Sequence, residues 1–302
     1  MPVYLPPEPP RLWQPPRPAI IRHASDLVRP DLAMLPGMAP VTVRRKWPGK
    51  SAYELTGLLG LRSGLKLCLD AGDSASYTSG QVWLDRSGNG YDFNRGSTSS
   101  SESSDPTFNG SAGGLSASEY FKFDSGDWFT YDSANEPWMK NIHQAGAKFG
   151  IATWVYIVAG SGTRVISGTR DASPSNIGFD FLLNTSDGLN FVVSKGSSPN
   201  ALTFSIGTIT EGAWQFLAVA GDEAAGAFVG MINGAVTVGG SSYSSPSSAD
   251  DTYTMRIGNG GGTGAALNND SRMSQFLAWE GVTPSLGQLM AYYRASRTRF
   301  GV

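Results

Sequence analysis

Several residue types are scarce in this sequence of 302 residues, and each scarcity excludes a class of protein. There is one cysteine, Cys68, so the chain can form neither an intramolecular disulfide nor a thiolate cluster for zinc. Cys68 lies in an apolar stretch and is expected to be a small buried side chain. Charged residues make up only 16 %, and a net charge of −2 provides no general surface for nucleic acid or anionic membranes.

Long apolar runs are missing as well. No stretch approaches 18 consecutive apolar residues, so the sequence predicts no helix that spans a membrane. The first residues, MPVYLPPEPPRLWQPP, lack the basic start and the apolar core of a secretory signal. We therefore expect a soluble protein or a subunit of a soluble assembly.

Proline is abundant, but 12 of the 18 prolines lie within the first 48 residues. This density excludes a continuous helix or a central strand there and predicts an extended, polyproline-like arm over residues 1–60. The arm is basic, since residues 1–66 sum to +6 and the remainder to −8. We predict that its spaced apolar side chains anchor it along a partner's surface: Tyr4, Leu12, Trp13, Ile20, Ile21 and Trp47. A solvated linker is the alternative.

Residues 61–302 have the pattern of one β-rich domain. Leu65, Leu67 and Leu69 alternate with polar or small residues, which is typical of a strand with one buried face. Asn233-Gly234 predicts a tight hairpin, because both residues accept positive φ. Further strands are expected at 149–158, 179–183, 189–193, 201–206, 214–220, 228–232 and 273–279, joined by Gly, Ser, Asn and Asp clusters.

The sequence thus predicts an all-β protein, a two-sheet antiparallel sandwich that follows the arm. One helix is expected near the C-terminus. Thr283 would cap it, Pro284 would occupy its first position, and apolar residues follow at helical spacing from Leu286. This helix should pack on the sandwich.

Several segments resemble, in order, the motifs of one family. LKLCLDAGD and VWLDRSGNGYDF, within 65–93, are similar to its opening strand and the turn that follows. GAWQF at 212–216 with the Asn233-Gly234 hairpin, and 274–285, resemble later strands and the closing helix. Residues from about 61 to 302 therefore resemble the laminin-G-like, concanavalin A-like lectin/glucanase superfamily. The resemblance implies a jelly roll, a fold shared by lectins, adhesion modules, glycosidases and structural domains.

The sequence gives little support to catalysis. A glycosidase needs two carboxylates flanking a sugar, and the E-x-D-x-x-E strand of glucanases with this fold does not occur. Asp222-Glu223 and Asp250-Asp251 are adjacent pairs whose side chains should point apart. The two histidines, His23 in the arm and His143, accompany no serine-nucleophile motif and are expected at the surface or in loops. We therefore predict no enzyme, with a glycoside hydrolase as the third choice.

Two kinds of binding remain open. Calcium is the best cofactor candidate, and Asp85, Asn89 and Asp92 could supply oxygen ligands, although Asx-type turns explain the same residues. No cofactor is the simpler expectation. A sugar would need accessible aromatic side chains, and Trp128, Tyr131 and Trp138 lie in a polar segment where they are least committed to a core.

The arm and the jelly roll together suggest a virion protein, because jelly rolls that follow such an arm resemble components of tailed-phage particles. The leading hypothesis is a non-enzymatic surface decoration or fibre-type component, anchored by the arm to capsid or tail subunits after assembly in the host cytoplasm. The alternative is a carbohydrate-binding adhesin that recognises a host glycan. Either protein could form a homo-oligomer.

Overall fold

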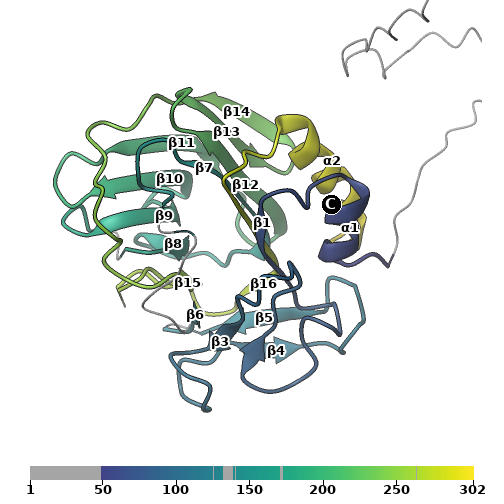
Figure 1. Ribbon diagram of the computed structural model, residues 1–302. Helices are drawn as coiled ribbons and strands as arrows, with labels where there is room; N and C mark the ends of the chain where they lie inside the picture. The colour runs from purple at the N-terminus through teal and green to yellow at the C-terminus, as the bar shows by residue number, and fades with distance from the viewer. Residues whose placement is uncertain (1–48, 125, 132–138, 140, 171–172, 263) are drawn as a thin grey trace, which may run out of the picture. The chain divides into compact units, whose positions relative to one another are not determined.

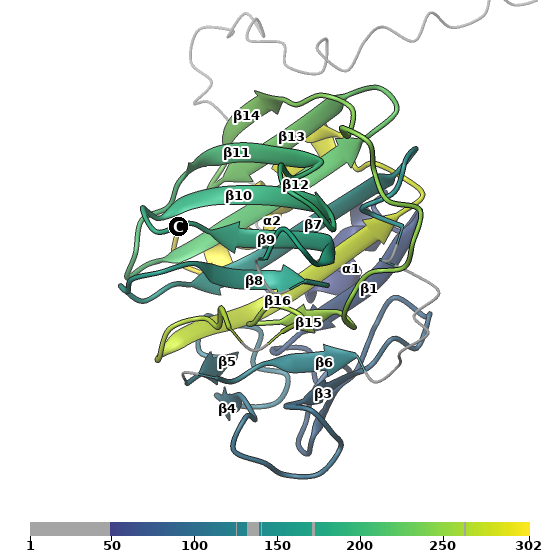
Figure 2. The same ribbon diagram turned by 90° about the vertical axis from the view of Figure 1, so that its left-hand side faces the viewer.

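The computed structural model describes residues 49–302 except 125, 132–138, 140, 171–172 and 263. The chain divides into two units, 1–45 and 46–302, and all described residues belong to the second. Its strands form two antiparallel sheets (Figures 1 and 2), so the predicted all-β sandwich is confirmed. No described helix is long and apolar enough to cross a membrane.

Sheet A has the strand order β14-β13-β12-β7-β16-β5-β4, with β1 also paired to β16. The bounds of its strands are β1 Leu65–Asp70, β4 Thr107–Asn109, β5 Tyr120–Phe123, β7 Lys148–Tyr156, β12 Trp214–Asp222, β13 Ala227–Ile232, β14 Ala235–Gly239 and β16 Ser271–Glu280. Sheet B has the order β11-β10-β9-β8-β15-β6-β3-β2. Its strands are β2 Val82–Trp83, β3 Phe93–Arg95, β6 Phe129–Tyr131, β8 Arg164–Gly168, β9 Ile177–Leu183, β10 Gly188–Lys195, β11 Leu202–Thr208 and β15 Arg256–Ile257.

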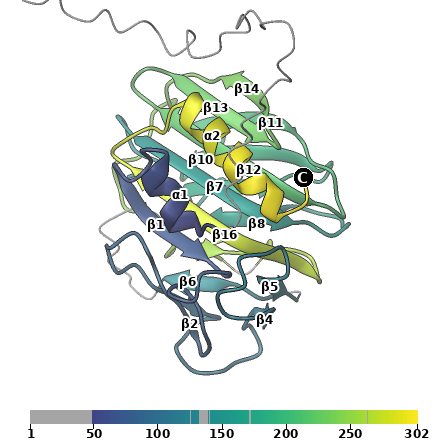
Figure 3. The ribbon, with the colours of Figure 1, turned by 90° about the vertical axis from the view of Figure 1, so that its right-hand side faces the viewer.

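The central strand β7 explains why the sandwich has two apolar layers. Phe149, Ile151 and Val155 point between the sheets into the main core. Ala152 and Trp154 point the other way and pack beneath the helices α1, Ala52–Leu58, and α2, Leu286–Ser296. Figure 3 shows both helices lying across this outer face of sheet A. Since both faces of β7 are covered, its sequence is a nearly continuous apolar run.

Helix α1 lies within the range predicted for the arm, so that boundary is placed too late. Ser51 accepts a hydrogen bond from the Glu54 amide, and the Glu54 carboxylate accepts one from the Ser51 amide, which forms a capping box. Ala52 and Leu55 are buried against the outer layer of sheet A. The folded domain therefore begins before residue 61.

Helix α2 begins two residues later than the sequence predicts. Ser285 is its N-cap and forms a capping box with Gln288. Thr283 instead donates its hydroxyl to the Gly221 carbonyl, 2.7 Å away, at the end of β12. Cys68 is fully buried in the outer layer, as predicted, and burial raises the pKa of its thiol.

The buried carboxylate of Asp70, at the end of β1, joins the two ends of the domain. It accepts hydrogen bonds from the Ala52 amide at 2.8 Å and from the Gln275 side chain at 3.0 Å. Both guanidinium Nη atoms of Arg299, in the short 3₁₀ helix Arg297–Arg299, lie 2.9 Å from its oxygens. Sheet A, α1 and the C-terminal turn are therefore all bonded to the same carboxylate, that of Asp70.

Replacing Asp70 with alanine leaves the Arg299 guanidinium buried without its carboxylate, and we expect a loss of about 3–5 kcal/mol in the free energy of unfolding. Denaturant titration of the full chain measures this loss. The control is Lys50→Ala, which removes an exposed pair with Glu54 and should cost less than about 1 kcal/mol. Similar losses for both variants would contradict a central role for Asp70.

Candidate functional site

Of the aromatic residues that the sequence predicts for sugar binding, the structure describes Trp128 and Tyr131. The arm residues Tyr4, Leu12, Trp13, Ile20, Ile21 and Trp47, and also Trp138, lie outside the described residues. Trp128 precedes β6 and Tyr131 ends it, so strand alternation directs their side chains to opposite faces of sheet B. Trp128 and Tyr131 therefore do not share one face of sheet B.

Each of these two aromatic rings already has neighbours. The Arg256 guanidinium lies 4.7 Å from the centroid of the Trp128 ring, on the outer face. Tyr131 is half-buried against the main core and contacts Tyr91 edge-on, with ring centroids 5.5 Å apart. A glycan contact at Trp128 alone stays a prediction.

The turn that carries the calcium candidates covers the free edge of β1. Asp85 accepts hydrogen bonds from the amides of Cys68 and Ser87, at 2.9 and 2.8 Å. Asn89 donates its amide to the carbonyls of Leu65 and Lys66, at 3.0 and 3.2 Å. These side chains take the place of a neighbouring strand for β1.

The third calcium candidate, Asp92, holds this turn closed. Its carboxylate accepts a hydrogen bond of 2.8 Å from the Asp85 amide. The side chains of Asp85, Asn89 and Asp92 are thus all hydrogen-bonded, either within the turn or to the backbone of β1. No group of three or more His, Cys, Asp or Glu side chains suited to a metal occurs among the described residues.

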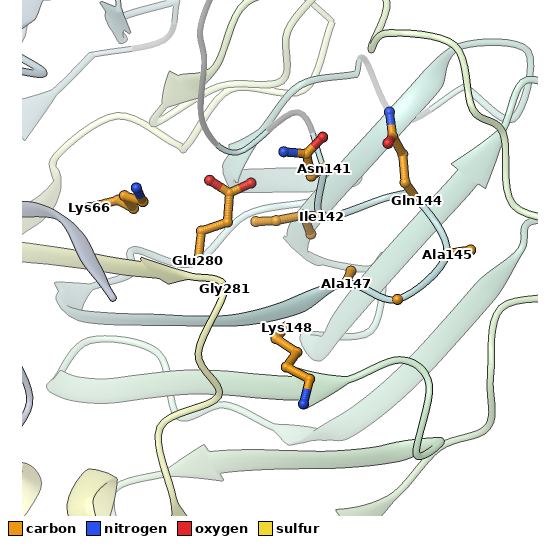
Figure 4. A pocket seen from close by; sticks show the side chains of 10 residues that line it. Lys66, Asn141, Ile142, Gln144, Ala145, Ala147, Lys148, Glu280 and Gly281 are labelled. Atoms are coloured by element: carbon orange, nitrogen blue, oxygen red, sulfur yellow. The ribbon is translucent and has the colours of Figure 1, made fainter. Parts of the chain in front are cut away.

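A pocket of about 430 Å³ opens at the rim of the sandwich, where β1 and β7 begin and β16 ends (Figure 4). Its polar side chains come from three separate segments: Lys66, Asn141, Gln144, Lys148 and Glu280. Ala145, Gly146 and Ala147 line the rest with little bulk. This volume lies within the range of pockets that bind small molecules.

Glu280 provides the carboxyl group of this pocket. Burial raises its pKa above the ordinary range, while hydrogen bonds from Met139 and Asn141 and the charge of Lys66 act in the opposite direction. Tyr91 lies near enough that Glu280, after burial, contributes to raising the pKa of its phenol. Carboxyl, amide and amine groups therefore face one small volume.

Lys148 differs from Lys66 in what its amine contacts. Its Nζ lies 3.0 Å from the Asp222 carboxylate, and Figure 4 shows its side chain extending away from Glu280 and Asn141. Lys66 is therefore the better placed cation for a ligand.

The loop that supplies Asn141 and Gln144 is fixed from below. The Ile142 carbonyl accepts a hydrogen bond from the Tyr243 hydroxyl at 2.9 Å, and the Gly146 amide donates to Glu223 at 2.6 Å. His143 lies in this loop but is fully buried, with Nε2 2.8 Å from the Ala249 carbonyl, so a surface position for it is wrong. Asp222 and Glu223 point to different partners, as predicted.

Sequence reasoning missed this pocket because its residues carry no local motif. Lys66, Asn141 and Glu280 become neighbours only through the pairing of β1 and β7 with β16. The one available signal is the polar segment KNIHQAGAK at 140–148, directly before the longest apolar strand of the sequence.

Comparison with known proteins supports the fold. Residues 137–282 match a family model described as the concanavalin A-like lectin/glucanases superfamily. The chain is similar to a structure of botulinum neurotoxin type C, a toxin whose cell entry depends on interaction with two ganglioside molecules. The TM-score is 0.54 at 13 % identity, over 79 % of this chain and 53 % of that one.

Two further structures show the same likeness. The binding domain of botulinum neurotoxin DC in complex with SialylT has a TM-score of 0.54 at 13 % identity, over 78 % of this chain and 52 % of that one. Trypanosoma rangeli sialidase in complex with sialic acid has a TM-score of 0.52 at 12 % identity, over 78 % and 34 %. The chain thus spans about a third to a half of these proteins, and identities this low show the fold alone. No curated protein matches the sequence.

The hydrogen bonds around Asp85 predict that the domain does not depend on calcium. Asp85→Ala leaves the Cys68 amide without its acceptor and should lower the free energy of unfolding by about 1–3 kcal/mol, equally with calcium and with EDTA. Thermal and denaturant unfolding measure both effects, with Asp124→Ala, an exposed carboxyl, as the control. A calcium-dependent rise in melting temperature that Asp85→Ala abolishes would instead establish the metal site.

Proposed function

We propose that this domain of the concanavalin A-like lectin/glucanases superfamily binds carbohydrate and catalyses no reaction. The observation that carries the proposal is the rim pocket, where Glu280, Asn141 and Lys66 face the same volume. Sugar hydroxyl groups both donate and accept hydrogen bonds. The carboxyl and amide groups can accept from them, and the amide and the amine can donate.

Support for this ligand class also comes from the solved structures of similar fold. Their titles name gangliosides, SialylT and sialic acid as the molecules bound. Most glycosidases use two carboxyl groups, one on either side of the bond, and among the described residues that line the pocket Glu280 is the one carboxyl. Binding without turnover is therefore the simpler proposal.

A glycan array with the full chain identifies the sugar, and calorimetry with that sugar then tests the site. We expect Glu280→Ala and Asn141→Ala each to weaken binding about tenfold, corresponding to about 1.4 kcal/mol, because each removes a hydrogen-bonding group from the pocket. Lys195→Ala, a change in β10 outside the pocket, is the matched control and should change affinity less than twofold.

Trp128→Ala distinguishes the pocket from the aromatic site nominated by the sequence. If binding is lost in Trp128→Ala and retained in Glu280→Ala, the sugar lies on the outer face of sheet B and the pocket proposal is wrong. Release of reducing sugar from any polysaccharide by the wild-type chain would contradict a purely binding role.

We also propose that the domain is displayed on a virion surface by its N-terminal arm, which anchors it to capsid or tail subunits. The motivation is the composition of residues 1–45, with 11 prolines, spaced aromatics and basic charge. The chain divides into two units between residues 45 and 46, and α1 packs on the sandwich, so the arm to be deleted is 1–45 rather than 1–60.

Deleting residues 1–45 should leave the melting temperature unchanged and abolish incorporation into particles, as measured by the occupancy of purified particles. Deleting 1–60 is the control for folding. It removes Ala52 and Leu55 from the outer layer and should lower the melting temperature. Full occupancy after deletion of 1–45 would show that the arm is no anchor.

A further inference from the structure

The edges of the two sheets are protected unequally. Among the described residues, β4 has three residues and β2 has two, which is too short to pair with another chain. The edge of β1 is covered by the Asp85 turn. In sheet B, β11 pairs with β10 through an irregular register. The Ile206 carbonyl of β11 accepts a hydrogen bond from the Thr237 hydroxyl.

Strand β14 is the exception. It has five residues, AVTVG, in regular register with β13 and without a bulge. It contains no proline and no charged residue, which are the usual devices that prevent pairing at a sheet edge. Glycines flank it at 234 and 240.

The Asn233-Gly234 turn determines which backbone groups of β14 face outward. Both residues have positive φ, 49° and 84°, as a two-residue primed turn requires. The pair Ile232 and Ala235 closes this turn. Bonded pairs alternate in an antiparallel ladder, so Ala235, Thr237 and Gly239 direct their amides and carbonyls to β13, and Val236 and Val238 direct theirs away.

The outward side of β14 is self-complementary. Suppose that two copies of β14 lie antiparallel about a two-fold axis that passes beside Thr237. Val236 of each copy then lies opposite Val238 of the other, which gives two such pairs. Each pair can exchange two backbone hydrogen bonds, and the four valine side chains then lie on the same face. A two-fold interface needs such a matching of one surface with itself.

The side chains and charges of this region also suit a second copy. Val238 is 70 % exposed and Val236 is 36 % exposed, both on the outer face of sheet A. Beside them lies a hollow of about 500 Å³, whose apolar lining includes Val229, Val238, Pro284 and Leu286 and extends the apolar area beyond one strand. Asp222, Thr283 and Ser285 also line it. The neutral strand creates no like-charge repulsion against its own copy.

We propose that β14 is the dimerisation surface of this protein, where two copies join their A sheets edge to edge. The pairing continues sheet A across the two-fold axis and covers Val236 and Val238. The rim pocket is lined by residues from β1, β7, β16 and the 141–147 loop, none of them in β14. Dimerisation therefore stands independently of carbohydrate binding.

The test is sedimentation of the full chain over a range of micromolar concentrations, with the fold of each variant checked by thermal unfolding. The wild type should be a dimer. Val236→Lys with Val238→Lys places like charges directly opposite each other in both pairs, and it should raise the dissociation constant at least about 100-fold. Leu58→Lys, a change at a side chain that is 53 % exposed on α1, is the matched control and should remain dimeric.

A charge-swapped variant tests the register. In Val236→Glu with Val238→Lys, the acidic side chain of one copy faces the basic side chain of the other, so the dimer should return. A monomeric wild type would overturn the proposal. So would a lysine double variant that stays dimeric, or a folded charge-swapped variant that stays monomeric.

Discussion

The buried ion pair between Asp70 and Arg299 connects the start of the folded domain to its end. A carboxylate without exposed surface is stable only if charge and hydrogen bonds replace its water, and here α1, Gln275 and Arg299 supply them together. Because all three bind the Asp70 carboxylate, they hold the start of the folded chain against its end. It also fixes how β1 pairs with β16.

That pairing has consequences at the rim of the sandwich. Leu65 lies opposite Trp279 and Leu67 opposite Ala278, so Lys66 is an extra residue in β1 beside the end of β16, and it borders the same pocket as Glu280. The Asp85 turn closes the outer edge of β1 and leaves Lys66 at the surface beside the pocket. The 65–93 segment, which resembles the opening motif of the family, therefore also positions Lys66 at the rim pocket. None of the carboxylates in this segment lines the pocket.

Local patterns were sufficient to predict much of this fold. Alternation identified β1, the Asn233-Gly234 turn identified the β13-β14 hairpin, and the apolar setting of Cys68 predicted its burial, because each depends on neighbouring residues. Helix α1 has a local signal, the capping box of Ser51 and Glu54, but the prolines up to Pro48 favour an extended chain just before it. The three-residue spacing of Trp128 and Tyr131 already implied opposite strand faces.

The remainder depends on contacts between distant segments and could not be predicted from the sequence. His143 is buried through a contact with Ala249, more than a hundred residues away, and nothing around it in the sequence indicates this. Lys66, Asn141 and Glu280 likewise meet only after three strands pair. Contacts between residues far apart in the sequence determine the site. The alternation of apolar and polar residues determines only the strands on which the site residues lie.

The central claim is that this jelly roll binds a sugar at its rim rather than on the outer face of sheet B. The most direct measurement is a crystal structure of the full chain with the oligosaccharide selected by a glycan array. The account predicts a sugar ring in contact with Glu280, Asn141 and Lys66. A ring stacked on Trp128, with the rim pocket holding only water, would contradict it.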